Sequence, residues 1–189
     1  MTTPTGVLLT GGASRRLGTD KALLVRTGET LASRATRVLR AVCPHAVEVG
    51  VGHTTLPHTR EEPAGGGPLA ALLAGVDATG AEVALLLAVD LPNVDVPLLR
   101  LLADWPGAAT VVPVAGGRVQ PVCARYGSDA IARARLELAR GERSLRAVLD
   151  APDVELVDES VWSSVAPLDA FADVDVAADV ARLGLEPPR

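Results

Sequence analysis

Short apolar runs alternate along this chain with longer segments in which apolar residues recur at helical spacing. Each short run ends at glycines or polar residues, a pattern typical of buried strands in a parallel sheet. The run over residues 83–89 is the most apolar, so we expect it at the centre of the sheet. The pattern predicts strands over residues 7–9, 46–51, 83–89, 109–114, 119–126 and 153–158, with a hairpin-like turn at Gly116 and Gly117.

The segments between these strands carry helix signals. Pro68 suits a first helical turn, and Asp95 and Ser128 are expected N-caps. Asp175 is the expected cap of a last helix, with Gly184 beyond its end. The predicted helices cover residues 28–43, 68–78, 96–104, 128 to about 139, 143–150 and 176–183.

Strands that alternate with helices indicate an α/β fold, with a three-layer, mostly parallel twisted sheet that carries helices on both faces. We expect residues 1–189 to form one domain. Ligands of such sheets bind outside the carboxyl ends of the strands. The Gly11-Gly12 pair and Asp90 each follow a predicted strand. They should therefore share the ligand-binding edge.

Composition narrows the function classes. Hydrophobic residues make up 48% of the chain and aromatic residues only 2%, so Ala, Val and Leu must build the core. The net charge of −5 does not attract nucleic acid. No run is long enough to span a membrane and the start lacks a signal-peptide pattern, so we expect a cytoplasmic protein with no membrane partner. Cys43 and Cys123 are expected as small core residues.

Lys21 is the only lysine, although Lys and Arg together total 18. It closes a glycine-rich segment of the form G-G-x-S-x-R-x-G-x-D-K, in which Arg15 and Arg16 add two further positive charges. Paired glycines let backbone N–H groups approach a ligand closely, and an ammonium suits a narrow phosphate pocket. The segment therefore predicts a phosphate-binding loop, although it matches neither GxxxxGK[ST] nor GxGxxG.

This loop resembles the signature of the MobA family, the nucleotidyltransferases that make molybdopterin guanine dinucleotide. The usual form is L-A-G-G-x-S-x-R-M-G-x-D-K; here Thr10 replaces the Ala and Leu17 the Met. The resemblance extends over residues 6–183. It includes segments similar to the family's G-P-L-A-G, D-x-P, Q-P and F-x-N-x-N-T-P stretches, which here begin at Gly67, Asp90, Gln120 and Phe171, and the stretch from Gly141 to Leu145 matches a late helix-entry segment of the family.

The resemblance implies a Rossmann-like nucleotidyltransferase fold and transfer of GMP from GTP to the phosphate of molybdopterin, with release of pyrophosphate. It implies catalytic roles for Lys21, Arg16 and Asp90, and Mg²⁺ as cofactor, with Asp90 as a metal ligand. Asp175 is implied either as a second metal ligand or in orienting the pterin. The implied nucleotide-binding residues are Leu9, Thr10, Gly11, Gly12, Ser14, Lys21, Glu62, Gly67 and Asp90. Cofactor-synthesis proteins and recipient apo-enzymes are further partners that the family suggests.

The chain departs from the family where base and pterin choice would be decided. Gly50 stands where several members carry Asn, and Glu61-Glu62 stand where an Asp is usual. Asp173 and Asp175 replace two Asn residues. Three alternatives therefore stay open: a CTP-using molybdopterin cytidylyltransferase, transfer to another phosphorylated acceptor, and a non-catalytic nucleotide-binding module. The three histidines show no metal-site spacing and are expected at the surface: His45, His53 and His58.

Overall fold

The computed structural model describes residues 3–11, 17–62, 64–107 and 110–188. Within them the main sheet has eight strands, in the order β10-β7-β9-β6-β1-β4-β5, with β8 paired to β7. Its strands are β1 (Thr5–Leu9), β4 (Ala46–Val49), β5 (His58–Thr59), β6 (Ala84–Ala88), β7 (Thr110–Ala115), β8 (Arg118–Val119), β9 (Cys123–Tyr126) and β10 (Val154–Val157). A separate small hairpin joins β2 (Val25–Arg26) to β3 (Glu29–Thr30).

Most of the sheet is parallel, as predicted. β1 runs parallel to β4 and β6, and β4 runs parallel to β5. The exceptions are β9, which lies antiparallel to both β6 and β7, and β8, which lies antiparallel to β7. β6 lies in the middle of the strand order, which confirms the central place expected for the most apolar run.

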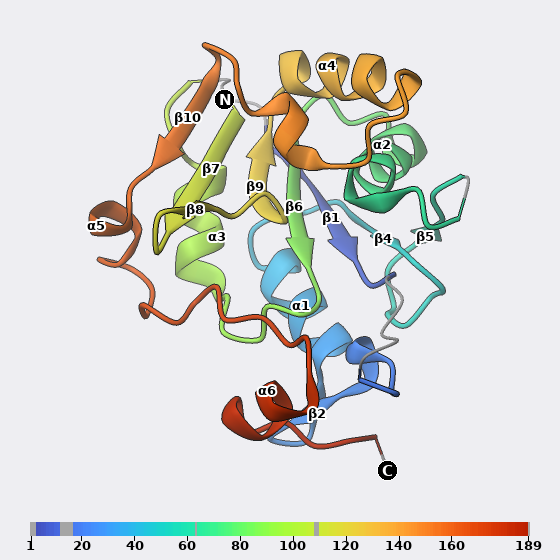
Figure 1. Cartoon of the computed structure of the whole chain (residues 1–189), viewed down its shortest axis with the longest axis vertical. Helices are drawn as coiled ribbons and strands as arrows, with labels where there is room; N and C mark the ends of the chain where they lie inside the picture. The colour runs from blue at the N-terminus through green and yellow to red at the C-terminus, as the bar shows by residue number, and fades with distance from the viewer. Residues whose placement is uncertain (1–2, 12–16, 63, 108–109, 189) are drawn as a thin grey trace.

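Helices cover both faces of this sheet (Figure 1). They are α1 (Leu31–Arg40), α2 (Gly67–Thr79), α3 (Val96–Ala103), α4 (Ser128–Ala139), α5 (Glu159–Trp162) and α6 (Ala177–Arg182), with single 3-10 turns η1 (Lys21–Leu23) and η2 (Leu145–Val148). The core forms two apolar clusters. Leu8 of β1 belongs to the cluster with α1 and α3, whereas Val7 and Leu9 belong to the cluster with α2. This alternation along one strand confirms the three-layer α/β fold.

Several predicted elements differ from the structure. The helix expected over residues 143–150 is only the 3-10 turn η2, which begins after Ser144, whose hydroxyl accepts the N–H of Arg146 as N-cap. The helix expected over residues 28–43 begins at Leu31, since the Thr30 side chain accepts a hydrogen bond from the Ser33 N–H as N-cap. The strand expected over residues 119–126 is split between β8 and β9. Pro121 lies in the break, and its ring nitrogen has no hydrogen for a sheet ladder.

The last helix has a different cap from the expected one. Val176 occupies the N-cap position of α6, and Asp179 accepts hydrogen bonds from the backbone N–H groups of Asp175 and Val176. The Asp175 carboxylate is therefore not needed as a cap. α4 likewise begins at Ser128, with Gly127 as its N-cap. The pattern did not predict η1, β2, β3, β5 or α5.

Two of the four aromatic residues and both cysteines lie in the interior. Trp162 and Tyr126 are fully buried, and Trp162 packs edge-to-face on Phe171 with ring centroids 5.0 Å apart. Cys43 and Cys123 are buried free thiols, and burial raises the pKa of each to about 12. Among the described helices, none is both long and apolar enough to cross a membrane.

Candidate active site

A cavity of about 500 Å³ opens at the carboxyl edge of the sheet, beside the ends of β1 and β6 and the start of α2. Six predicted nucleotide-binding residues line it: Leu9, Thr10, Gly11, Lys21, Gly67 and Asp90. Glu62 is exposed and is not among the lining residues, whereas its neighbour Glu61 is. Gly12, Ser14 and Arg16 lie outside the described residues.

Hydrogen bonds to β4 fix the two residues that follow β1, Thr10 and Gly11. The N–H groups of Thr10 and Gly11 both donate to the carbonyl oxygen of Val49, at 3.1 and 3.3 Å. The Thr10 hydroxyl donates to Oε1 of Glu48 at 2.6 Å. These bonds hold the first residues of the glycine loop against β4, so that Gly11 faces the cavity.

Glu48 is a buried carboxylate that the sequence analysis did not single out. Besides Thr10, its oxygens accept hydrogen bonds from the N–H groups of Gly52, His53 and Thr54, at 3.0, 2.8 and 2.9 Å. Burial opposes its charge, but these hydrogen bonds outweigh that effect and lower the pKa of Glu48 to about 2. A glutamate inside an otherwise apolar strand was the signal that could have identified it.

The start of α2 forms another wall of the cavity. Gly67 has φ of +87°, and a Cβ there would lie 3.0 Å from the carbonyl oxygen of Arg143. That carbonyl accepts the N–H of Leu69 at 3.1 Å. Glycine is required here both by the backbone conformation and by the close approach of the Arg143 segment. The positive end of the α2 dipole thereby borders the cavity, where it favours an anion.

Lys21 joins three segments that are distant in sequence. It begins η1, which the Asp20 side chain caps by accepting the N–H of Ala22 at 3.0 Å. Its Nζ lies 3.1 Å from Oδ2 of Asp90 and 2.7 Å from Oδ1 of Asp175. Burial opposes the ammonium charge, but the hydrogen bonds and charges of the two aspartates prevail and raise the pKa of Lys21. Lys21 is therefore cationic at neutral pH.

The C-terminal segment is anchored at this edge. The N–H of Val174 donates to the carbonyl oxygen of Asp90 at 3.1 Å, and Glu186 exchanges two backbone hydrogen bonds with Val25 of β2, each of 2.8 Å. Asp175 thus reaches Lys21 from a segment fixed at both ends.

Asp90 and Asp175 face each other across the Lys21 ammonium. Burial, opposed by Lys21 and reinforced by the charges of Asp173 and Asp175, raises the pKa of Asp90. Within the part of the chain that the structure describes, no group of three or more His, Cys, Asp or Glu side chains is placed to hold a metal ion. Two facing carboxylates nevertheless suit Mg²⁺, which keeps several waters and needs only one or two protein carboxylates.

One histidine differs from its expected place. His45 and His58 are exposed. His53 is half-buried, because its Nε2 lies 2.9 Å from Oδ2 of Asp20. The residue before Lys21 in the motif therefore contacts the loop that Glu48 organises.

Residues 6–157 match the family model of the MobA-like NTP transferase domain. The chain belongs to this family. The match confirms the family that the glycine loop and the later segments indicated, and it identifies the protein as a nucleotidyltransferase.

Two relatives by sequence carry the same name. A protein of Opitutus terrae named "Probable molybdenum cofactor guanylyltransferase" is 39% identical over 152 residues, which cover 75% of each chain. A Mycobacterium marinum protein of the same name is 36% identical over 188 residues, which cover 93% of this chain and 90% of the relative.

Solved structures confirm the fold of this MobA-like chain. The molybdopterin-guanine dinucleotide biosynthesis protein A of Archaeoglobus fulgidus superposes with a TM-score of 0.80 at 18% identity, over 94% of this chain and 95% of that one. A structure described as Rv0371C of Mycobacterium tuberculosis in complex with manganese superposes with a TM-score of 0.64 at 16% identity, over 96% and 98%. At these identities the likeness concerns the fold alone.

Proposed function

We propose that this protein is a molybdenum cofactor guanylyltransferase, which transfers GMP from GTP to the phosphate of molybdopterin and releases pyrophosphate. The observation that carries this proposal is the contact of Lys21 with both Asp90 and Asp175 at the wall of the cavity behind the glycine loop. The names of the relatives by sequence support the same reaction.

The reaction makes modest demands on the protein. The acceptor phosphate is already ionised, so the attack on the α-phosphorus needs no protein nucleophile and no strong general base. The difficulty is to bring two anions together and to stabilise the charge that spreads over the transferred phosphoryl group. Lys21 and the N-terminal end of α2 supply positive charge for this purpose.

Mg²⁺ is the cofactor that we propose for this site. Asp90 would hold it, with Asp175 as the second carboxylate, in exchange for their present contacts with Lys21. When bound, the ion would neutralise phosphate charge and polarise the α-phosphoryl group. Asp90 and Asp175 would then act to keep the triphosphate and the acceptor phosphate at one place on the sheet edge.

Glu61 is the lining residue on the loop before α2, and its Oε1 accepts the N–H of Gly65 at 3.2 Å. Gly50 offers no side chain to a base. Because these positions depart from the family pattern, GTP and CTP must be compared directly.

The test measures transfer of α-³²P-labelled nucleotide to molybdopterin, together with pyrophosphate release. We expect Mg²⁺-dependent product with GTP and little with CTP, ATP or UTP. Product with CTP in place of GTP would assign the cytidylyltransferase activity, and no product with any nucleotide and this acceptor would refute the proposal.

The Asp90→Asn variant separates an enzyme from a nucleotide-binding module. We expect it to abolish metal-dependent transfer while metal-free GTP still raises the melting temperature of the protein. Transfer at the original rate in this variant would remove Asp90 from the mechanism.

A further inference from the structure

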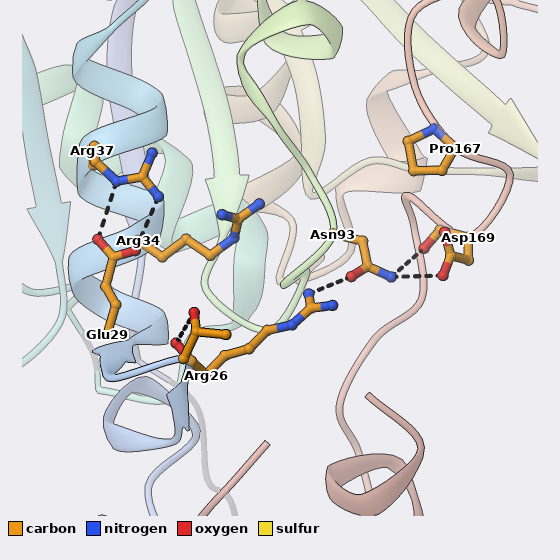
Figure 2. Close-up of a pocket in the computed structure, with 8 residues that line it drawn as sticks. Arg26, Glu29, Arg34, Arg37, Asn93, Pro167 and Asp169 are labelled. Atoms are coloured by element: carbon orange, nitrogen blue, oxygen red, sulfur yellow. Dashed lines mark hydrogen bonds and ion pairs between the residues drawn. The ribbon is translucent and has the colours of Figure 1, made fainter. Parts of the chain in front are cut away.

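A second cavity, of about 450 Å³, lies beyond the nucleotide pocket and shares no lining residue with it. It is lined by Arg26, Thr27, Glu29, Arg34, Arg37, Asn93, Pro167 and Asp169 (Figure 2). Both cavities border the segment after β6, because Asp90 lines the first and Asn93 the second. The nucleotide site accounts for none of these arginines.

Two of these arginines, Arg26 and Arg34, donate their hydrogen bonds to neutral acceptors. Arg34 donates from Nε to the carbonyl oxygen of Pro92 at 2.8 Å and from a terminal nitrogen to that of Val94 at 3.3 Å. Arg26 donates to Oδ1 of Asn93 at 2.7 Å. Within the described residues, neither arginine forms an ion pair. Their charges are therefore held in place without being neutralised.

The acidic residues of this cavity have other partners. Arg37 binds Glu29 with two hydrogen bonds, of 3.2 and 3.0 Å, and this contact lowers the pKa of Glu29. Oδ2 of Asp169 accepts a hydrogen bond from Nδ2 of Asn93 at 3.0 Å. The Arg37–Glu29 pair is self-compensating, and the Asp169 carboxylate opposes one of the two charges of the half-buried Arg26 and Arg34, so the lining carries a net charge of +1.

We propose that the cavity between Arg26 and Arg34 binds the phosphate group of a small molecule. Guanidinium forks bind phosphate oxygens in pairs, and each guanidinium carries five N–H donors, more than its present bonds use. The volume of about 450 Å³ exceeds that of the phosphate group itself and leaves room for the rest of a small phosphate ester.

A ligand in this cavity would affect the hydrogen bonds that hold the segment after Asp90. Arg26 and Arg34 both donate to the carbonyl oxygen of Pro92, two residues beyond Asp90, at 3.4 and 2.8 Å. A phosphate that draws the guanidinium groups toward itself would change these two bonds. The site therefore lies where binding can alter the position of the Asp90 segment without contact with the nucleotide.

The direct test is a crystal of the 189-residue chain soaked in selenate, a tetrahedral analogue of phosphate whose selenium gives an anomalous signal. We expect an anomalous peak within hydrogen-bond distance of both guanidinium groups. A peak confined to the glycine-loop pocket, or no peak at all, would overturn the proposal. This experiment uses the unmodified chain and does not depend on the folding of any variant.

A solution test uses thermal unfolding with inorganic phosphate against sodium chloride of equal ionic strength. Phosphate also stabilises many proteins by exclusion from their surface, so the comparison must be between variants. Arg26→Gln removes one charge of the cavity, and Arg118→Gln removes an exposed charge on β8 as a matched control. Circular dichroism checks that each variant is folded.

We expect the phosphate-dependent rise in melting temperature to fall by at least half in Arg26→Gln and to be unchanged in Arg118→Gln. It should also persist in Lys21→Ala, which alters the nucleotide pocket alone. An equal rise in all variants, or a loss in Lys21→Ala only, would refute the second site. An equal rise in all variants would refute the second site but would not contradict the proposed transfer reaction.

Discussion

The Thr10 hydroxyl lies against the Cα of Gly50, at the start of the glycine loop, where a larger residue than glycine would not fit. A Cβ added at Gly50 would lie 2.0 Å from Oγ1 of Thr10. The hydroxyl cannot move away without loss of its 2.6 Å hydrogen bond to the buried Glu48. In the family pattern these positions carry Ala and, in several members, Asn. The Thr10 hydroxyl here occupies the space that the first atom of a side chain at position 50 would need.

This pair predicts strong coupling between substitutions. Gly50→Ala should lower the free energy of unfolding by about 2–3 kcal/mol, because an overpacked atom must displace a bonded hydroxyl. Thr10→Ala should cost about 1 kcal/mol for the lost hydrogen bond. In the double variant, Gly50→Ala should lower the free energy of unfolding by at least about 1 kcal/mol less than it does in the presence of Thr10.

Urea unfolding of the four proteins measures this cycle. Additive effects at the two positions would show that the Thr10 hydroxyl is not the obstacle. The other close neighbours of the added Cβ, Oε1 of Glu48 and the Gly11 nitrogen, both at 3.2 Å, would then set the cost.

The lowered pKa of Glu48 predicts that its contribution to the free energy of unfolding depends on pH. Its pKa is about 2 in the folded protein, below the value of about 4.3 for an unfolded chain. A depressed pKa contributes stability above pH 4.3, and this contribution is lost as the pH falls through the folded value of about 2. Glu48→Gln should therefore lower the free energy of unfolding by about 2 kcal/mol at pH 7.

The difference between the two proteins should shrink between about pH 5 and pH 2. Chemical denaturation at a series of pH values checks this. A constant difference over that range would mean that the carboxylate charge contributes nothing and that packing alone explains the loss.

Lys21 should be required for catalysis more than for folding. Because its ammonium is shared by Asp90 and Asp175, Lys21→Ala removes the positive charge from the site. We expect kcat/KM for nucleotidyl transfer to fall by about 10²–10³. Lys21→Arg should recover little of this activity, since a planar fork does not replace a compact ammonium.

Steady-state kinetics with Arg118→Ala as a surface control, and melting curves for each variant, test this expectation. Full activity of Lys21→Ala would remove Lys21 from the proposed mechanism. A loss of activity that merely followed a collapse of the melting temperature would mark Lys21 as a structural residue.

Gly67 should be less replaceable than Gly80, although both have positive φ and lie at opposite ends of α2. Gly67 has φ of +87° with the Arg143 carbonyl 3.0 Å from an added Cβ, whereas Gly80 has φ of +65° and open space around it. Gly80→Ala should cost about 1 kcal/mol from backbone strain alone. Gly67→Ala should cost about 2–3 kcal/mol, since it adds steric overlap.

Equilibrium unfolding compares these two variants directly. Gly67→Ala should also weaken nucleotide binding, because the residue lines the cavity, and Gly80→Ala should leave that affinity unchanged. Equal costs for the two substitutions would show that the Arg143 segment moves aside.

Several elements of this protein follow from local pattern alone. The apolar run that becomes β6, the Asp95 cap of α3 and the proline at the start of α2 are each specified by neighbouring residues. Alternation of strands and helices sufficed for the α/β class, and the strand ends sufficed to bring Gly11 and Asp90 to one edge.

Which distant side chains meet depends on the packing of the whole fold. Asp175 was expected to cap α6, but Val176 occupies the N-cap position and Asp175 contacts Lys21 instead. The place of β9 between β6 and β7, antiparallel to both, and the meeting of Arg26 with Asn93 depend equally on the whole fold. The physical reason is that a side chain has several local partners of similar energy, and the packing of remote segments selects among them.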